Sequence, residues 1–268
     1  MVFLPLSAGR AATRIIAIAN QKGGVGKTTT AVNLAACLAA AERRTLLLDI
    51  DPQGNATSGL GVDRRAAPGA YELLVGEAKI AEAARPTSAP GLDLVPASER
   101  LIGAEIELAA APKREARLKE ALATGVEGYA FILIDCPPSL GLLTVNALTA
   151  AHSVLIPLQC EYYALEGLAR VIEAVHRCRM RLNPGLQIEG IVLTMYDIRL
   201  NLSEQVEQEV RRHFPREVFR TVIPRNIRLS EASSFGKPVI LYDIRSSGAE
   251  SYLRLAKELI DGTAQSPR

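Results

Sequence analysis

Short apolar runs recur along the chain and alternate with longer segments whose apolar residues have helical spacing. The runs are apolar throughout instead of alternating with polar residues, which is typical of strands covered on both faces in a parallel sheet. Strands are predicted at 15–19, 45–50, 129–134, 153–157, 188–194 and 218–223, with a weaker one at 92–96. Helices are predicted at 28–41, 114–123, 164–181, 202–214 and 249–260.

This alternation predicts the fold class, a single doubly wound α/β domain with a mostly parallel sheet and helices on both faces. We expect the domain to span 14–262, after a flexible lead-in at 1–13 and before a tail at 263–268. A Pro- and Ala-rich stretch at 85–91 is expected to form an exposed loop within it. Because crossovers between parallel strands are right-handed, the functional loops should lie at the carboxyl ends of the strands.

Composition and charge narrow the classes of function. The 268 residues are 48% hydrophobic and 22% charged, and the net charge is only +2. Any contact with nucleic acid must therefore come from local clusters of basic residues. The four cysteines form no C-x-x-C pair and have no histidine at metal-binding spacing, which indicates reduced thiols and a cytoplasmic location. No apolar run approaches the ~18 residues of a membrane span, so no membrane partner is expected.

A glycine-rich segment joins the first predicted strand to the first predicted helix, where residues 20–30 read N-Q-K-G-G-V-G-K-T-T-T. Glycines allow a tight turn that aims backbone N–H groups inward, and with the positive end of the helix these groups form a cradle for phosphate. Lys27 can then reach the β- and γ-phosphates, and the Thr28 hydroxyl can bind Mg²⁺. The segment 22–29 therefore predicts an ATPase of the P-loop NTPase type that uses ATP and Mg²⁺. Its nucleotide-binding residues are Gly23, Gly24, Val25, Gly26, Lys27, Thr28 and Thr29.

The loop departs in one place from the usual pattern G-x-x-x-x-G-K-[ST]. Gln21 stands where the pattern has glycine, and Lys22 follows it. Lys22 is hard to explain as a ligand of its own nucleotide, since Lys27 fills that role. It could point outward, toward a nucleotide in a second subunit, or it could be a solvent-exposed lysine of the loop.

Two further apolar runs end in aspartate. Residues 46–53 read L-L-L-D-I-D-P-Q, and Asp51 lies just beyond a strand end, where a carboxylate can orient the water that attacks the γ-phosphate. Asp49 faces the same side and has either a structural role or a role through Mg²⁺-bound water. Alternatively, both aspartates merely cap their loop. Residues 131–139 read F-I-L-I-D-C-P-P-S, and Asp135 is expected to hold Mg²⁺, mostly through water, unless it caps a helix. The loop after Asp135 is a candidate sensor of the γ-phosphate.

Taken together, the segments K-G-G-V-G-K-T-T, D-I-D-P-Q-G-N-A-T and D-C-P-P-S-L-G resemble the ParA/Soj family of chromosome-partitioning ATPases. Three more segments agree, and they read L-T-M-Y-D at 193–197, I-P-R-N-I-R-L-S-E-A at 223–232 and G-K-P-V at 236–239. The resemblance covers about 14–260. Two departures from the family pattern are Ser233 in place of proline and Leu200 in place of threonine, and the second could adjust a DNA contact.

The resemblance implies a set of roles. Lys22 matches the signature lysine that reaches across an ATP sandwich dimer, and with Lys27 and Asp51 it forms the expected catalytic set. The adenine side is implied to be Met195, Pro224, Arg225 and Asn226. The family cycles between an ADP-bound or empty monomer and an ATP-bound homodimer that binds double-stranded DNA without sequence specificity. A ParB-like centromere-binding partner stimulates hydrolysis and releases the dimer, which implies a nucleoid-associated protein.

The residues give partial support to DNA binding. Between Arg170 and Arg228 the chain has eleven arginines, no lysine and seven acidic residues. Dimerisation would double this local excess of positive charge, and guanidinium groups suit phosphate oxygens. Arg199, Arg225 and Arg228 are the candidate DNA contacts, and no recognition helix or zinc finger is indicated. The alternative is a solvated helix face that carries Arg–Glu pairs.

Other ATPases of similar fold fit the sequence less well. A MinD-type positioning ATPase, acting on a membrane or a protein cargo, is the main alternative, but the C-terminal residues lack the basic amphipathic helix that binds a membrane. An electron-transfer ATPase needs cluster-binding cysteines, and none occurs between Cys37 and Cys136. A small-molecule kinase or synthetase needs a group that activates an acceptor, and none stands out.

Overall fold

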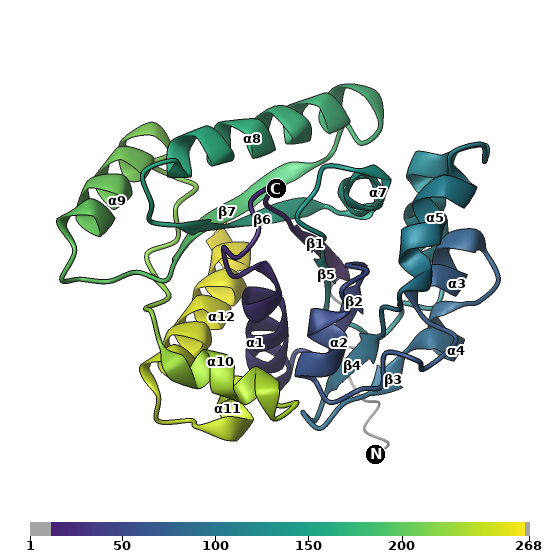
Figure 1. Ribbon diagram of the computed structural model, residues 1–268, viewed down its shortest axis with the longest axis horizontal. Helices are drawn as coiled ribbons and strands as arrows, with labels where there is room; N and C mark the ends of the chain where they lie inside the picture. The colour runs from purple at the N-terminus through teal and green to yellow at the C-terminus, as the bar shows by residue number, and fades with distance from the viewer. Residues whose placement is uncertain (1–11, 266–268) are drawn as a thin grey trace, which may run out of the picture.

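The computed structural model describes residues 12–265, and its centre is a seven-stranded sheet in the order β3-β4-β2-β5-β1-β6-β7 (Figure 1). All neighbouring strands are parallel except β3 and β4. The strands are β1 (Arg14–Ile18), β2 (Thr45–Asp49), β3 (Arg85–Pro86), β4 (Leu92–Val95), β5 (Phe131–Asp135), β6 (Ser153–Gln159) and β7 (Gln187–Thr194). The predicted doubly wound α/β fold is confirmed.

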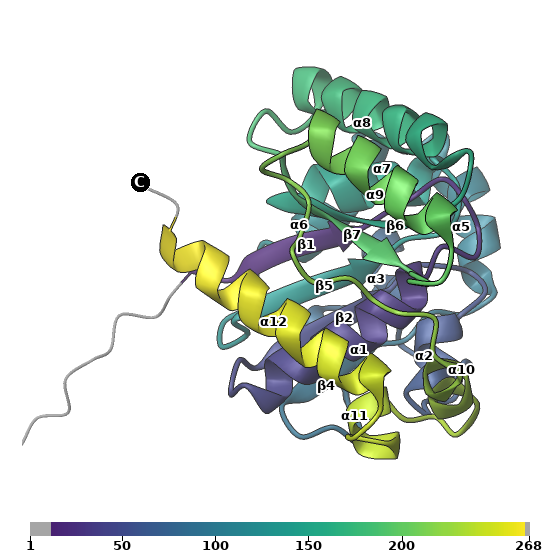
Figure 2. The ribbon, with the colours of Figure 1, turned by 90° about the vertical axis from the view of Figure 1, so that its left-hand side faces the viewer.

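Helices cover both faces of the sheet because successive side chains of each strand point to opposite faces. Ile16 and Ile18 of β1 pack into one hydrophobic core with α1 and α12, whereas Ile15 and Ala17 pack into the other with α7 and α8. Figure 2 shows α7 and α8 on one side of the sheet, and α1 and α12 on the other. The helices are α1 (Lys27–Ala40), α2 (Asn55–Gly59), α3 (Ala70–Val75), α4 (Ile80–Ala83), α5 (Arg100–Leu108), α6 (Arg117–Ala121), α7 (Leu142–Ala150), α8 (Ala164–Arg181), α9 (Asn201–His213), α10 (Ile227–Ser234), α11 (Val239–Tyr242) and α12 (Ser247–Gln265), with a 3₁₀ turn η1 (Arg114–Ala116).

The strand predicted at 218–223 does not form. Val218 makes only an isolated bridge to Ile191 of β7. The amides of Arg220 and Thr221 instead donate to the Glu258 carboxylate on α12, at 2.7 and 3.0 Å. The amides of Phe219 and Ile223 still donate to the Ile191 and Leu193 carbonyls of β7, so the contact with Glu258 interrupts the pairing between these two points.

Two shorter segments also differ from expectation. The helix predicted at 114–123 is divided into η1 and α6, because the backbone of Ala116, where the two meet, is not helical (φ −109°, ψ 3°), and α6 ends after Ala121. The stretch 85–91 is not entirely a loop, since its first two residues form β3 and pair antiparallel with β4.

Three strands bring their carboxyl ends together at the centre of the sheet. Ile18 of β1 and Asp49 of β2 are both register partners of Asp135, the last residue of β5. The glycine-rich segment starts immediately after β1, so it lies beside the ends of β2 and β5. The lead-in at 1–11 and the tail at 266–268 lie outside the described residues.

Candidate nucleotide site

The loop between β1 and α1 is held by hydrogen bonds to β6 and β7. The Asn20 side chain donates to the Pro157 carbonyl on β6 at 2.7 Å and accepts from the Lys22 amide at 3.0 Å. The Thr194 hydroxyl at the end of β7 donates to the Val25 carbonyl at 2.8 Å. Gly26 precedes α1 with φ of 87°, a left-handed conformation that favours glycine. The loop therefore presents the open N-terminus of α1 in a fixed position.

Lys27 is buried within this loop. Its side chain is only 6% exposed, and its Nζ donates to the Lys22 carbonyl at 2.9 Å. Burial lowers the pKa of the ammonium, and the charge of Asp135 opposes this effect. The ammonium thus lies between the loop and the end of β5, where it can meet an anion.

Asp135 is a fully buried carboxylate whose two oxygens have no hydrogen-bond partner among residues 12–265. Burial raises its pKa well above the ordinary value, and the neighbouring charge of Asp49 adds to the rise, while the Thr28 side chain opposes it. Buried charges are usually paired or bound to a metal, so the unpaired oxygens are suited to bind a cation. Mg²⁺ fits, because it takes few protein ligands and completes its shell with water and phosphate. Neither this site nor any other part of the described chain has a cluster of three or more His, Cys, Asp or Glu side chains that could hold a metal, so phosphate and water would have to supply most of the ligands.

Asp49 is buried as deeply as Asp135, but its oxygens are occupied. They accept from the Thr57 amide at 2.8 Å, the Thr57 hydroxyl at 2.7 Å and the Asp51 amide at 3.2 Å. Burial raises the pKa of Asp49 to about 6. Of the two roles considered for Asp49, these contacts favour the structural one, since they tie both ends of the loop from Asp51 to Thr57 to β2.

Asp51 lies in a tight turn directly beyond β2 and is 6% exposed. Its carboxylate accepts from the Gln53 amide at 2.9 Å, and its carbonyl accepts from the Gly54 amide at 2.8 Å. Gly54 has φ of 60°. The turn sets the carboxylate next to the ends of β2 and β5.

A cavity of about 430 Å³ adjoins the N-terminus of α1 on the side away from β2. It brings together the predicted adenine-side residues Met195, Pro224, Arg225 and Asn226 with Gly26 and Thr29. Sequence reasoning missed other residues of the lining, namely Thr194, Ile223, Ile227, Leu229, Ser230 and Tyr252. Most of these lie in the segments already singled out, but no local pattern marks Tyr252, which comes from α12 and shares a 3.1 Å hydrogen bond with Thr30.

Lys22 points away from the loop toward the surface. Its Nζ forms an ion pair with Glu161, in the connection between β6 and α8, and both side chains are about half-exposed. This position is compatible with both interpretations of Lys22, an outward-reaching lysine and a solvent-exposed one.

The three candidate DNA contacts differ in their surroundings. Arg199 forms a two-pronged pair with Asp197 at 2.9 and 2.7 Å, and this pair lowers the pKa of Asp197 to about 2. Arg228 contacts Glu231 at 2.7 Å and Asp243 at 3.5 Å. The Arg225 side chain makes no hydrogen bond or ion pair with other described residues. On α9, the pairs of Arg211 with Glu207 and of Arg212 with Glu209 match the alternative of a solvated face.

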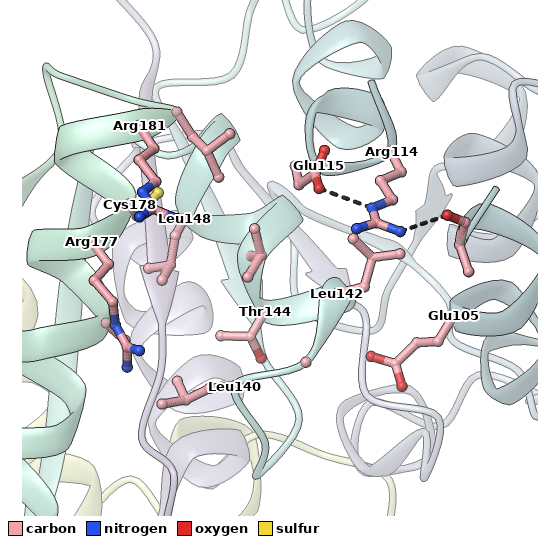
Figure 3. A pocket seen from close by; sticks show the side chains of 15 residues that line it. Glu105, Arg114, Glu115, Leu140, Leu142, Thr144, Leu148, Arg177, Cys178 and Arg181 are labelled. Carbon is pink, nitrogen blue, oxygen red and sulfur yellow. Dashed lines mark hydrogen bonds and ion pairs between the residues drawn. The ribbon is translucent and has the colours of Figure 1, made fainter. Parts of the chain in front are cut away.

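A separate cavity of about 580 Å³ lies between α5, α7 and α8 (Figure 3). Its wall includes Leu140 and Gly141 from the loop after Asp135, and Arg177 and Arg181 from α8. No predicted nucleotide residue lines it. The loop after Asp135 also approaches the glycine-rich loop, since a Cβ atom on Gly23 would lie 4.0 Å from the Cβ of Pro138.

Within the described chain, no helix combines the length and apolar character needed to cross a membrane.

Comparisons with known proteins agree with this geometry. A family model described as an AAA domain matches residues 13–188. The chain is 58% identical over 257 residues to the chromosome partitioning protein ParA of Myxococcus xanthus, covering 95% of this chain and 91% of that protein. It is also 58% identical over 247 residues to the sporulation initiation inhibitor protein Soj of Bacillus subtilis, covering 92% and 98%.

Among solved structures, cobyrinic acid a,c-diamide synthase from Mycobacterium smegmatis, with bound ATP analog and magnesium, matches with a TM-score of 0.83. The identity is 38%, and the match covers 95% of this chain and 97% of that one. The sequence identity to ParA and Soj is higher and extends over nearly the whole of each chain. The chain therefore belongs to the ParA/Soj family of chromosome-partitioning ATPases.

Proposed function

We propose that the chain is an ATP-dependent switch for DNA partitioning. It dimerises when ATP is bound, holds double-stranded DNA without reading its sequence, and releases the DNA after hydrolysis stimulated by a ParB-like partner. It acts in the cytoplasm, at the nucleoid. The observation that carries the proposal is the meeting of Lys27, Thr28 and the unpaired carboxylate of Asp135 at one loop.

Nucleotide binding follows from this meeting. The backbone N–H groups of 23–29 and the ammonium of Lys27 face the phosphates, and the cavity lined by Met195 and Pro224 takes the adenine. Thr28 and Asp135 are the residues that would hold Mg²⁺, which supplies charge neutralisation on the β- and γ-phosphates when bound. A cation bound there would also offset the unfavourable free energy of burying the Asp135 charge. Nucleotide and metal would therefore stabilise the same site.

Hydrolysis requires a carboxylate beside the attacking water. Asp51 is the candidate for this role. The Asp49 carboxylate already accepts hydrogen bonds from Thr57, and the Asp135 carboxylate is assigned to the metal. We propose that the Asp51 carboxylate orients the attacking water by accepting a hydrogen bond from it. Lys22 completes the site in trans, and to do so it must leave Glu161 and reach the nucleotide of the second subunit.

DNA binding is assigned to the surface around Arg199, Arg225 and Arg228. The backbone bridge between Tyr196 and Pro224 places the loop that carries Arg199 beside the segment that carries Arg225. Binding through phosphate contacts is weak for one subunit and gains from the doubled charge of a dimer. Membership in a family of partitioning proteins favours this function over the synthase activity named for the structural neighbour, because the identity is 58% against 38%.

The test is binding to a non-specific DNA duplex with ATP, with ADP and without nucleotide, each at several salt concentrations. Asp51→Ala is included to hold the ATP state. We expect salt-sensitive binding with ATP alone, and we expect Asp51→Ala to prolong it. Equal binding in all nucleotide states would remove the DNA assignment and would point to a protein or membrane cargo for the same ATPase.

A further inference from the structure

The Asp51 turn is covered from outside by a residue that no motif includes. Arg64, in the loop after α2, extends its guanidinium back over the turn, and its Nη2 donates to the Pro52 carbonyl at 3.2 Å. A Cβ atom on Gly54 would lie only 2.6 Å from Arg64 Nε, so the guanidinium lies directly against the backbone of the turn. The turn is therefore held from the inside by Asp49 and from the outside by Arg64.

Arg64 makes fewer hydrogen bonds than expected of a partly buried arginine with a purely structural role. Its Nε is buried and has no hydrogen-bond partner within the described chain. A buried donor without a partner is unfavourable, and an apolar side chain would fill the same space without this cost. The unused donor lies against Gly54, in the turn whose Pro52 carbonyl accepts from the Nη2 of the same guanidinium.

The other side of the guanidinium contacts the start of α5. Arg64 Nη2 lies 3.7 Å from a carboxylate oxygen of Glu99, the residue just before that helix. Both residues line a cavity of about 750 Å³ that separates the loop after α2 from α5. Glu99 is 82% exposed, so its attraction for Arg64 is weak, and the contact with the turn governs where the guanidinium lies.

We propose that Arg64 is a positioning residue for ATP hydrolysis, which acts by fixing the turn that carries Asp51. This inference rests on the proposed role of Asp51. A carboxylate that orients water must be placed to within a fraction of an ångström, because small displacements of a catalytic group cost large factors in rate. Arg64 does not touch the phosphate loop or the adenine cavity, so it affects turnover and leaves nucleotide binding unchanged.

The experiment compares Arg64→Ala and Arg64→Lys with Arg65→Ala, because the exposed side chain of Arg65 pairs with Asp63 and not with the turn that carries Asp51. We expect kcat for ATP hydrolysis to fall roughly tenfold in Arg64→Ala and severalfold in Arg64→Lys, with KM for ATP within about twofold of wild type. Arg65→Ala should match wild type. Arg64→Lys keeps the stem and the charge, so it carries the test if Arg64→Ala fails to fold.

A double variant separates this inference from the assignment of Asp51. If Arg64 acts through Asp51, Arg64→Ala combined with Asp51→Ala should hydrolyse ATP no more slowly than Asp51→Ala alone. Hydrogen exchange should also accelerate at the amides of Gln53 and Gly54 in Arg64→Ala, since these amides define the turn.

Wild-type kcat in both Arg64 variants, with Asp51→Ala inactive, would overturn the role of Arg64 and leave that of Asp51 intact. Equal losses of kcat, ATP affinity and melting temperature would also overturn it, as they indicate a folding role. Wild-type turnover in Asp51→Ala would remove both assignments.

Discussion

Asp49 and Asp135 are register partners at the ends of β2 and β5, and both are completely buried, yet among residues 12–265 only the carboxylate of Asp49 accepts hydrogen bonds. Burial raises the pKa of both carboxyl groups, the charge of Asp49 adds to the rise at Asp135, and the hydrogen bonds from Thr57 and Asp51 oppose the rise at Asp49. The Asp135 carboxylate is therefore an acceptor without a hydrogen-bond donor, and it lies where the glycine-rich loop meets the sheet. This relationship supports the proposed metal position independently of the sequence motif.

Neutralising Asp135 should separate folding from metal binding. Asp135→Asn removes a charge whose raised pKa marks it as unfavourable in the folded state, so the nucleotide-free protein should melt at the same temperature or a higher one. Mg²⁺-dependent ATP binding should weaken by roughly 10- to 100-fold. Thermal melting with and without Mg²⁺ and ATP checks both parts. A large drop in melting temperature without ligand would contradict the interpretation of Asp135 as an unpaired charge.

Protons and Mg²⁺ should compete for Asp135. Because its folded-state pKa is raised, the group gains a proton at a higher pH than an ordinary aspartate does, and this protonated form is the one that the fold without bound metal favours. Mg²⁺ needs the ionised form, so its affinity for the ATP complex should decrease as the pH is lowered over a series from 8 to 6. Calorimetric Mg²⁺ titrations at each pH measure this, with the Mg²⁺ affinity of free ATP as the reference. An affinity that follows free ATP at every pH would show that Asp135 does not titrate in this range.

The hydroxyl of Thr194 should matter for nucleotide affinity although it lies behind the phosphate loop. Thr194→Val keeps the shape but removes the 2.8 Å bond to the Val25 carbonyl, which is expected to cost about 1 kcal/mol. ATP affinity should fall severalfold, because the loop loses its tie to β7. Thr194→Ser, which retains the hydroxyl, is the matched control. Fluorescent nucleotide binding checks the comparison, and equal losses in both variants would show that the hydrogen bond of the hydroxyl is not what sets the affinity.

The parts of the site that the sequence predicts are those whose chemistry is local. The glycine-rich loop and the residues after β2 and β5 follow from strand ends and motifs, and all of them meet at one edge of the sheet. The prediction of a strand at 218–223 is wrong because the pairing with β7 is interrupted at Arg220 and Thr221, whose amides donate to Glu258 on a helix far along the chain. The contact of Arg64 with Pro52 could not be predicted either, because Arg64 lies in a loop that has no recognisable sequence motif. Long-range side-chain contacts of this kind leave no periodic signal.

Lys22 should be dispensable for folding and ATP binding but required for dimerisation. Its ion pair with Glu161 is about half-exposed on both sides and is therefore worth less than ~1 kcal/mol. Lys22→Ala should thus leave the melting temperature and monomer ATP affinity nearly unchanged, while ATP-dependent dimers disappear in analytical ultracentrifugation. Glu161→Gln breaks the same ion pair and keeps the ammonium, so it shows whether any effect comes from the pair. Normal dimerisation of Lys22→Ala would make Lys22 a plain surface lysine.

The DNA assignment gives a quantitative expectation for salt dependence. Arg199 and Arg228 are held by Asp197 and by Glu231 in the nucleotide-free chain, so contact with phosphate must exchange these carboxylates for DNA. Each phosphate contact adds about 0.9 to the slope of log affinity against log salt. If both arginines contact phosphate in each subunit of a dimer, replacing both by alanine should reduce the slope by roughly 3 to 4, with ATP hydrolysis retained. Arg212→Ala on α9, where the arginine is paired with Glu209, is the control and should leave the slope unchanged. The same loss in the control would place the DNA on α9, and an unchanged slope in the double variant would exclude Arg199 and Arg228 as phosphate contacts.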